Sequence, residues 1–144
     1  MEIYTIGFTE KSAADFFGRL RNAGVKRILD VRLNNTSHLA GFSKRDDLNF
    51  FTREVLGGEY LHLPSLAPTQ EMLDEYRKEK RGWENYERRF RDLIKERAIE
   101  KQLDPDLFKG ACLLCSEDKP HQCHRRIVAE YLKDAWNDVD IVHL

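Results

Sequence analysis

Two cysteines, a histidine and a glutamate lie close together near the end of the chain, in a polar stretch that follows a short apolar run. The stretch covers residues 115–126, with Cys115 at its start and Cys123 near its end. We expect these thiols to form a functional pair, with Glu117 and His124 beside them for proton transfer. A thiol can attack an electrophile or be oxidised reversibly. These four residues are therefore the catalytic candidates.

The basic residues that follow Cys123 indicate an anion-binding site. Residues 122–136 have the apolar spacing of a helix, so a histidine and two arginines fall in its first turn. Cations there oppose the helix dipole unless an anion neutralises them. We therefore expect Arg125 to bind a phosphate-containing ligand and the helix field to lower the pKa of Cys123. In the alternative interpretation, Arg125 holds the loop through Glu117 or Asp118.

The spacing of the cysteines argues against two other uses of this stretch. A phosphatase loop needs an arginine six positions after its cysteine, and His121 occupies that position relative to Cys115. A closed four-ligand zinc site would need Cys112 as well. Cys112 and Cys115 lie three residues apart in one strand, where such side chains point to opposite faces of the sheet. We therefore expect no metal and no cofactor, and a packing role for Cys112.

A second polar group follows the apolar run at residues 27–31. Asp30 and Arg32 lie two residues apart at its end, so both can face the same side as an ion pair. Such a pair either holds the loop or binds substrate. Ser37 lies in the polar loop that follows, and we include it with Asp30 and Arg32 among the substrate-binding candidates. His62 alternates with apolar neighbours, which favours a structural role.

Five short apolar runs predict the strands that position these residues. They cover residues 2–6, 27–31, 59–63, 111–115 and 138–143. Strands that alternate with helical segments favour an α/β fold. We expect one three-layer domain over residues 1–144, with a mostly parallel five-stranded sheet flanked by helices. Polar residues follow the strands, at the edge where parallel sheets bind ligands.

Local signals place the helices between these strands. Ser12 and Asp15 form a capping box at the start of the first helix. A second helix is expected to begin at Ser43 and to end at the glycine pair 57–58. Gly82 is expected to separate two charged helices within residues 69–102. Trp83 in this region is expected to pack rather than to stack on a base.

Composition limits the function classes. The 144 residues are 41% hydrophobic and 34% charged, with a formal net charge of −1. This balance indicates a folded domain and argues against a generic basic nucleic-acid binder. No apolar stretch is long enough for a transmembrane helix, and no signal peptide is recognisable. Three cysteines do not suggest a disulfide scaffold, so we expect a cytoplasmic protein without membrane partners.

The order of these motifs resembles a known family along essentially the whole chain. The motifs are Tyr4-Thr5-Ile6-Gly7-Phe8, Asp30-Val31-Arg32, Ser37, Phe42-Ser43, and Leu114-Cys115-x-Glu117 followed by Cys123-His124-Arg125. This pattern resembles the domain-of-unknown-function family numbered 488. The resemblance implies a compact α/β domain with its shared residues on one edge, and it implies no activity.

The leading hypothesis from the sequence is an enzyme that acts on a phosphate-containing ligand, such as a nucleotide or a nucleic-acid end. Arg32, Arg125 and the start of the last helix would bind the anion, and Cys115 or Cys123 would supply a nucleophile or redox thiol. Glu117, His124 or Asp30 would transfer protons. One alternative is a non-catalytic module that binds the same class of ligand. Another is a redox switch in which Cys115 and Cys123 form a reversible disulfide.

Overall fold

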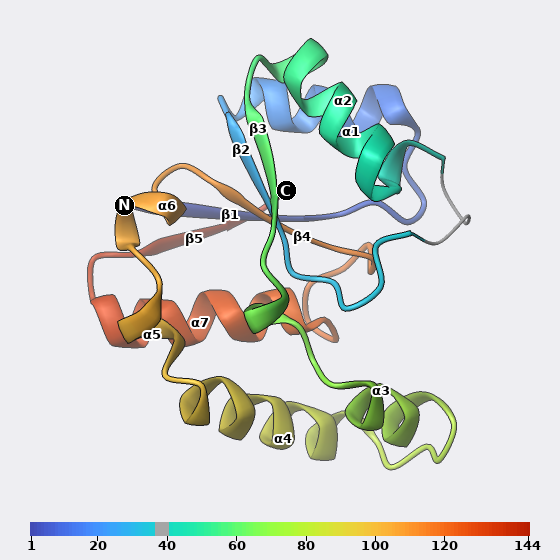
Figure 1. Ribbon diagram of the computed structural model, residues 1–144, viewed down its shortest axis with the longest axis vertical. Helices are drawn as coiled ribbons and strands as arrows, with labels where there is room; N and C mark the ends of the chain where they lie inside the picture. The colour runs from blue at the N-terminus through green and yellow to red at the C-terminus, as the bar shows by residue number, and fades with distance from the viewer. Residues whose placement is uncertain (37–40) are drawn as a thin grey trace.

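The five strands form one parallel sheet in the order β3-β2-β4-β1-β5. Figure 1 shows the computed structural model, which describes residues 1–36 and 41–144. The strands are β1 (Glu2–Gly7), β2 (Arg27–Asp30), β3 (Glu59–His62), β4 (Cys112–Cys115) and β5 (Asp140–His143). Every neighbouring pair is parallel. The expected α/β class and five-stranded parallel sheet are confirmed.

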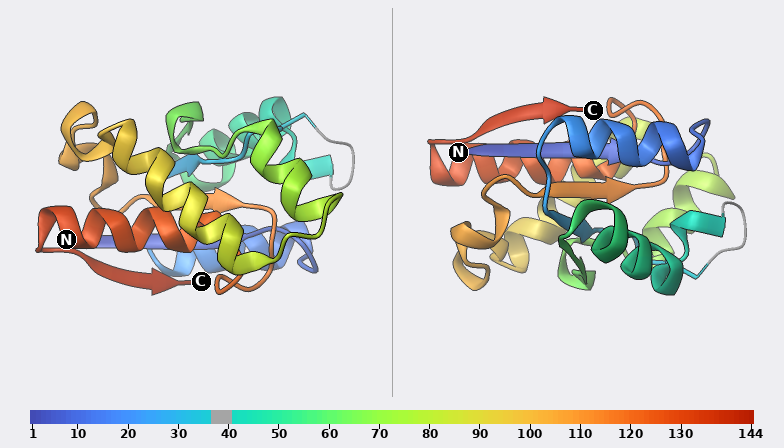
Figure 2. Two further views of the ribbon diagram at one scale, coloured as in Figure 1. Left: turned by 90° about the horizontal axis from the view of Figure 1, so that it is seen from below. Right: turned by 90° about the horizontal axis from the view of Figure 1, so that it is seen from above.

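Helices cover both faces of the sheet, which makes the expected layers (Figures 1 and 2). On one face lie α1 (Ala13–Asn22) and α2 (Arg45–Leu56). On the other face α7 (His124–Trp136) packs against the sheet, and α4 (Trp83–Glu96) packs on α7. The remaining helical segments on this side are η2 (Pro64–Leu66), α3 (Gln70–Arg77), α5 (Ile99–Gln102) and α6 (Pro105–Phe108). No helix among the described residues is long and apolar enough to cross a bilayer.

The central strand β4 contributes alternate side chains to the two cores. Cys112 and Leu114 pack with the core on the α1 and α2 side, whereas Leu113 and Cys115 pack with the core on the α7 side. This alternation is the period of two that an extended strand imposes. The prediction that Cys112 and Cys115 point to opposite faces is confirmed, and Cys112 is a fully buried core residue.

Caps and turns set the helix boundaries. The Ser12 hydroxyl accepts the backbone N–H of Asp15 at 3.1 Å, which confirms the predicted cap. The second helix begins at Arg45 rather than Ser43, because Gly41–Ser43 form a separate 3₁₀ turn, η1. Gly57 ends that helix in a left-handed conformation that favours glycine. The last helix begins at His124 rather than at residue 122, because the preceding residues form a turn closed by a hydrogen bond from Cys123 to Pro120.

The strand order creates a crevice at the carboxyl end of β4. This strand lies between β1 and β2. The chain after β1 and β2 leads to α1 and α2 on one face, whereas the chain after β4 leads to α7 on the other (Figures 1 and 2). Open α/β sheets bind ligands where neighbouring connections diverge in this way. Cys115, the last residue of β4, lies at this point.

The end of β1 supplies a test of how tightly the loop after β4 is packed. A Cβ at Gly7 would collide with the Glu117 carbonyl group, whereas a Cβ at Gly18 in α1 would meet nothing within 4 Å. We expect Gly7→Ala to lower the free energy of unfolding by about 2–3 kcal/mol. Gly18→Ala is the matched control, and we expect it to be stabilising by about 0.5–1 kcal/mol. Thermal and urea unfolding of both variants and the parent would measure these changes. A Gly7→Ala variant as stable as Gly18→Ala would contradict the close packing of Gly7 against the loop.

Candidate functional site

A pocket of about 990 Å³ opens at the carboxyl edge of the sheet. Its walls come from the loops after β1, β2 and β4 and from the helices α3 and α4. Residues that line it include Phe8, Lys11, Arg32, Tyr76, Arg77, Trp83, Tyr86, Cys115, Glu117, Cys123 and His124. The structure therefore brings the polar loops singled out in the sequence to one edge, as expected from a parallel sheet.

Cys115 and His124 form a thiol–imidazole pair in the wall of this pocket. The Cys115 Sγ lies 3.5 Å from His124 Nδ1, and both residues are buried. The His124 Nε2–H donates to the Val31 carbonyl oxygen at 2.6 Å, so Nδ1 is the nitrogen that faces the sulfur. The geometry thus places a thiol beside an imidazole whose other ring nitrogen is held by a backbone carbonyl.

Cys123 lies beside this pair, and its thiol favours ionisation of Cys115 rather than its own. A hydrogen bond from Cys123 lowers the pKa of Cys115 from its ordinary value of 9.0, with smaller contributions from the Ser116 backbone N–H and Arg125 that act against burial. Burial raises the pKa of Cys123 well above its ordinary value. The expectation that the helix field lowers the pKa of Cys123 was therefore wrong, because loss of hydration outweighs that field.

Arg125 is buried and bonded to the protein. Its Nη1 donates to the Glu117 carbonyl, its Nη2 to the Asp118 carbonyl at 3.2 Å, and its Nε to the Thr5 hydroxyl at 3.3 Å. Its relative exposure is 1%. This geometry favours the interpretation in which Arg125 holds the loop over the one in which it contacts phosphate.

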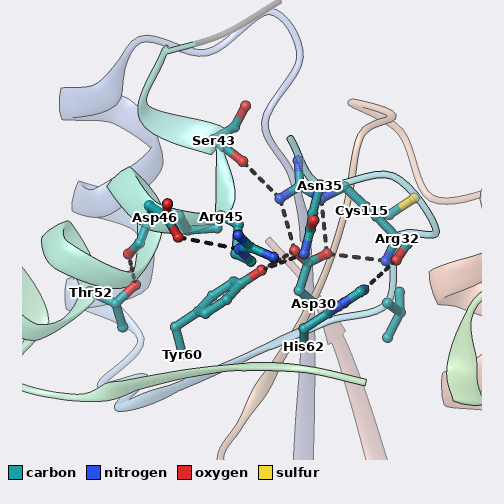
Figure 3. A network of polar contacts seen from close by, with 12 residues as sticks. Asp30, Arg32, Asn35, Ser43, Arg45, Asp46, Thr52, Tyr60, His62 and Cys115 are labelled. Atoms are coloured by element: carbon teal, nitrogen blue, oxygen red, sulfur yellow. Dashed lines mark hydrogen bonds and ion pairs between the residues drawn. The ribbon is translucent and has the colours of Figure 1, made fainter. Parts of the chain in front are cut away.

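Asp30 and Arg32 form a buried ion pair at the end of β2 (Figure 3). Arg32 donates Nε and Nη2 to the two Asp30 carboxylate oxygens, at 2.9 and 2.8 Å, and Nη2 also donates to the Ser43 carbonyl at 2.7 Å. The Tyr60 hydroxyl donates to Asp30 as well. These bonds hold the loop after β2 in place. Arg32 also lines the pocket, where its guanidinium lies over the Phe8 ring, 5.2 Å from its centroid.

The other residues singled out in the sequence have different surroundings. His62 Nε2 bonds the Arg32 carbonyl oxygen at 2.8 Å, which agrees with a structural role. The exposed Glu117 lines the pocket, while its backbone carbonyl holds Arg125. Ser37 lies outside the described residues.

Sequence reasoning missed the aromatic wall of the pocket. Trp83 stacks on Tyr86 with ring centroids 5.0 Å apart, and Tyr76 meets Trp83 edge-on at 5.6 Å. Trp83 thus packs, as expected, and also lines the pocket. The helical spacing of Trp83 and Tyr86 predicts that they lie on one face of their helix. It does not predict that this face lines a pocket. Lys11 was missed too, and its Nζ pairs with Asp118 at 2.6 Å across the β1 and β4 loops.

Three side chains at this site could hold a metal ion. The ligand atoms of Cys115, Cys123 and His124 all lie within 4.8 Å of one another. Cys112, the fourth residue that a closed zinc site would have needed, lies on the opposite face of the sheet.

Comparison with known proteins identifies the family of the chain. A family model described as "Domain of unknown function DUF488" matches residues 12–132, which include both cysteines of the site. Neither the comparison with curated proteins nor that with solved structures found a match.

Thiol labelling tests the electrostatics of this site. In chelator-treated protein, we expect iodoacetamide to modify Cys115 before Cys112 and Cys123, because the pKa of Cys115 is lowered and burial raises the other two. Since the thiolate is the reactive form, the rate for Cys115 should reach half its maximum below pH 9. Peptide mapping by mass spectrometry at several pH values would measure this. Equal, slow labelling of all three cysteines would contradict it.

The role of Arg125 has its own test. We expect Arg125→Ala to reduce the free energy of unfolding by about 3 kcal/mol, since hydrogen bonds from a charged group contribute ~1.5–3 kcal/mol and the loss leaves buried acceptors unpaired. Arg53→Ala, on the exposed surface of α2, is the control and should change stability by less than ~0.5 kcal/mol. Urea unfolding of both variants measures the difference. An Arg125 variant as stable as the parent would argue against the loop-holding role.

Proposed function

The chain belongs to the family described as Domain of unknown function DUF488, and from its site we propose an enzyme that uses the Cys115 thiolate on a phosphate-containing ligand. The ligand class is a nucleotide or a nucleic-acid end. The observation that carries the proposal is the Cys115–His124 pair, with 3.5 Å between Sγ and Nδ1, in the wall of a pocket at the β4 crevice. The pair combines a thiol with an oriented base at the edge of the sheet where open α/β folds bind ligands.

The pair supports a two-step substitution. Transfer of the Cys115 proton to His124 Nδ1 gives a thiolate and an imidazolium. The sulfur attacks an electrophilic atom of the ligand, and the bond to the leaving group breaks as that group takes its electron pair and the proton from His124. Water then attacks the same atom, His124 accepts a proton from it, and the thiolate leaves. The thiolate takes this proton back from His124, which restores the starting state, and the net reaction is hydrolysis of the ligand.

Positive charge near the thiol supports an anionic ligand. The N-terminus of α7 faces the crevice, and its first backbone N–H groups attract negative charge. Arg77 lies exposed on the pocket wall, at the end of α3. Arg32 contributes a fixed guanidinium that is already neutralised by Asp30. Arg77 is therefore the side chain best placed to reach a phosphate from solvent.

The aromatic wall supports a ligand that also carries a flat ring. Tyr76 and Trp83 are partly exposed and line the pocket, whereas Tyr86 behind them is buried. Aromatic side chains stack on nucleobases with a contribution of ~1–3 kcal/mol per base. A ring against this wall and a phosphate near Arg77 match the two parts of a nucleotide.

Ligand screening with active-site variants tests the proposal. We expect a panel of nucleotides and 5′-phosphorylated oligonucleotides to contain a ligand that raises the melting temperature of the parent and is converted to product, as followed by chromatography. Cys115→Ser should still bind it and should lose turnover by ~10³-fold or more. Cys112→Ser, in the opposite core, is the matched control and should retain turnover.

The outcomes separate the alternatives. Binding without turnover by the parent would instead favour the non-catalytic module. The redox switch would be favoured if Cys115 and Cys123 form a disulfide under mild oxidation and no ligand from the panel binds. Turnover by Cys115→Ser at the parental rate would contradict a nucleophilic role for this sulfur.

A further inference from the structure

We infer that Cys115, Cys123 and His124 form a three-ligand site for a soft divalent cation such as Zn²⁺, and that the bound cation blocks Cys115. Binding of the cation does not depend on the proposed enzymatic function. The inhibition does rest on it, because it needs Cys115 to be the nucleophile.

The donor set and its dimensions suit zinc. Thiolate sulfur and imidazole nitrogen are the ligands that Zn²⁺ prefers, with bonds of about 2.3 and 2.0–2.1 Å. Tetrahedral angles between such bonds place the sulfur and the nitrogen about 3.5 Å apart. Cys115 Sγ and His124 Nδ1 are separated by 3.5 Å, and the Cys123 sulfur completes a group whose atoms lie within 4.8 Å. A small movement of side chains would therefore close three bonds around one ion.

The orientation of His124 also matches that of a metal ligand. Its Nε2–H is held by the Val31 carbonyl at 2.6 Å, which leaves the lone pair of Nδ1 directed at the thiols. Histidines that bind metals commonly donate their other ring N–H to a carbonyl or carboxylate, which fixes the ring and its tautomer. The same hydrogen bond serves the Cys115–His124 pair when no cation is bound.

The site offers three protein ligands and leaves one position to the pocket. Among residues 1–36 and 41–144, the group consists of Cys115, Cys123 and His124, and all three line the pocket. Zinc sites with three protein ligands hold water or an anion in the fourth position. Binding releases the two thiol protons, and the charge of the two thiolates offsets that of the ion.

Cation binding and nucleophilic attack are competing states of one sulfur. A lone pair of Cys115 that is shared with Zn²⁺ is not free to attack a ligand, and His124 Nδ1 is occupied as well. Substitution of Cys123 distinguishes the two states, because its sulfur is a ligand of the cation but does not attack the ligand of the enzyme. Cys112 provides a matched control, since it is a buried cysteine on the opposite face of the same strand.

Metal titration of the full chain tests the site. We expect chelator-treated parent protein and Cys112→Ser to bind one equivalent of Zn²⁺ in competition with a chromogenic indicator, and Cys123→Ser to bind at least ~100-fold more weakly. With Co²⁺ in place of Zn²⁺, the parent should show the near-ultraviolet charge-transfer absorption of thiolate ligands. Circular dichroism would establish that each variant is folded, and Cys123→Ala serves if the serine variant is not. Absence of stoichiometric binding, or equal affinities of the Cys112 and Cys123 variants, would overturn the inference.

Alkylation separates failure of this site from failure of the proposed function. Zn²⁺ should protect Cys115 from iodoacetamide in the parent and not in Cys123→Ser, where serine keeps a hydrogen-bond donor beside the thiolate. If Zn²⁺ does not bind and Cys115 still supports turnover, the metal site is wrong and the enzymatic proposal stands. If Zn²⁺ binds and protects Cys115 while no ligand is turned over, the metal site stands and the enzymatic proposal fails.

Discussion

The buried guanidinium of Arg125 ties the loop after β4 to the sheet, and this loop leads from Cys115 at the end of β4 to His124 at the start of α7. It bonds Glu117 and Asp118 in the loop and Thr5 in β1, so one side chain joins the loop to the sheet. Gly7 lets the loop approach β1 where any larger residue would collide. The Lys11–Asp118 ion pair adds a second tie between the same two segments. The part of the pocket wall that follows β1 and β4 is thus held by contacts between two loops.

The sheet and the polar loop after β4 were predictable because their signals in the sequence are local. Each strand appears as a short apolar run, and the order of polar residues after strands implies a shared edge once the sheet is parallel. The Cys115, Cys123 and His124 group follows from the same reasoning, since the end of one central strand and the start of the next helix are joined by a short loop. Even the opposite orientation of Cys112 needs only the two-residue period of a strand.

Two features of the site could not be predicted from the sequence, because they depend on how deeply a side chain is buried and on the register between neighbouring strands. The helix field and burial act on Cys123 in opposite directions, and only its depth decides which prevails. The register places Tyr60 on β3 near Asp30 on β2, so its hydroxyl completes the buried ion pair. Nothing in the sequence around Tyr60 indicates that partner. Likewise, Arg125 donates to the backbone carbonyls of Glu117 and Asp118. Every residue has a backbone carbonyl, so the sequence cannot indicate which ones Arg125 binds.

The loop-holding role of Arg125 also has an electrostatic consequence for the thiol. In the described part of the chain its hydrogen-bond partners are two carbonyls and a hydroxyl, none of which carries a negative charge. A buried cation without a carboxylate is costly unless some other negative charge lies within reach. Cys115 supplies such a charge when it ionises, and Arg125 is among the groups that lower the pKa of Cys115. A neutral donor could bind the same carbonyls but could not offset a thiolate. The residue that shapes the loop therefore also favours the reactive form of the sulfur that the loop positions.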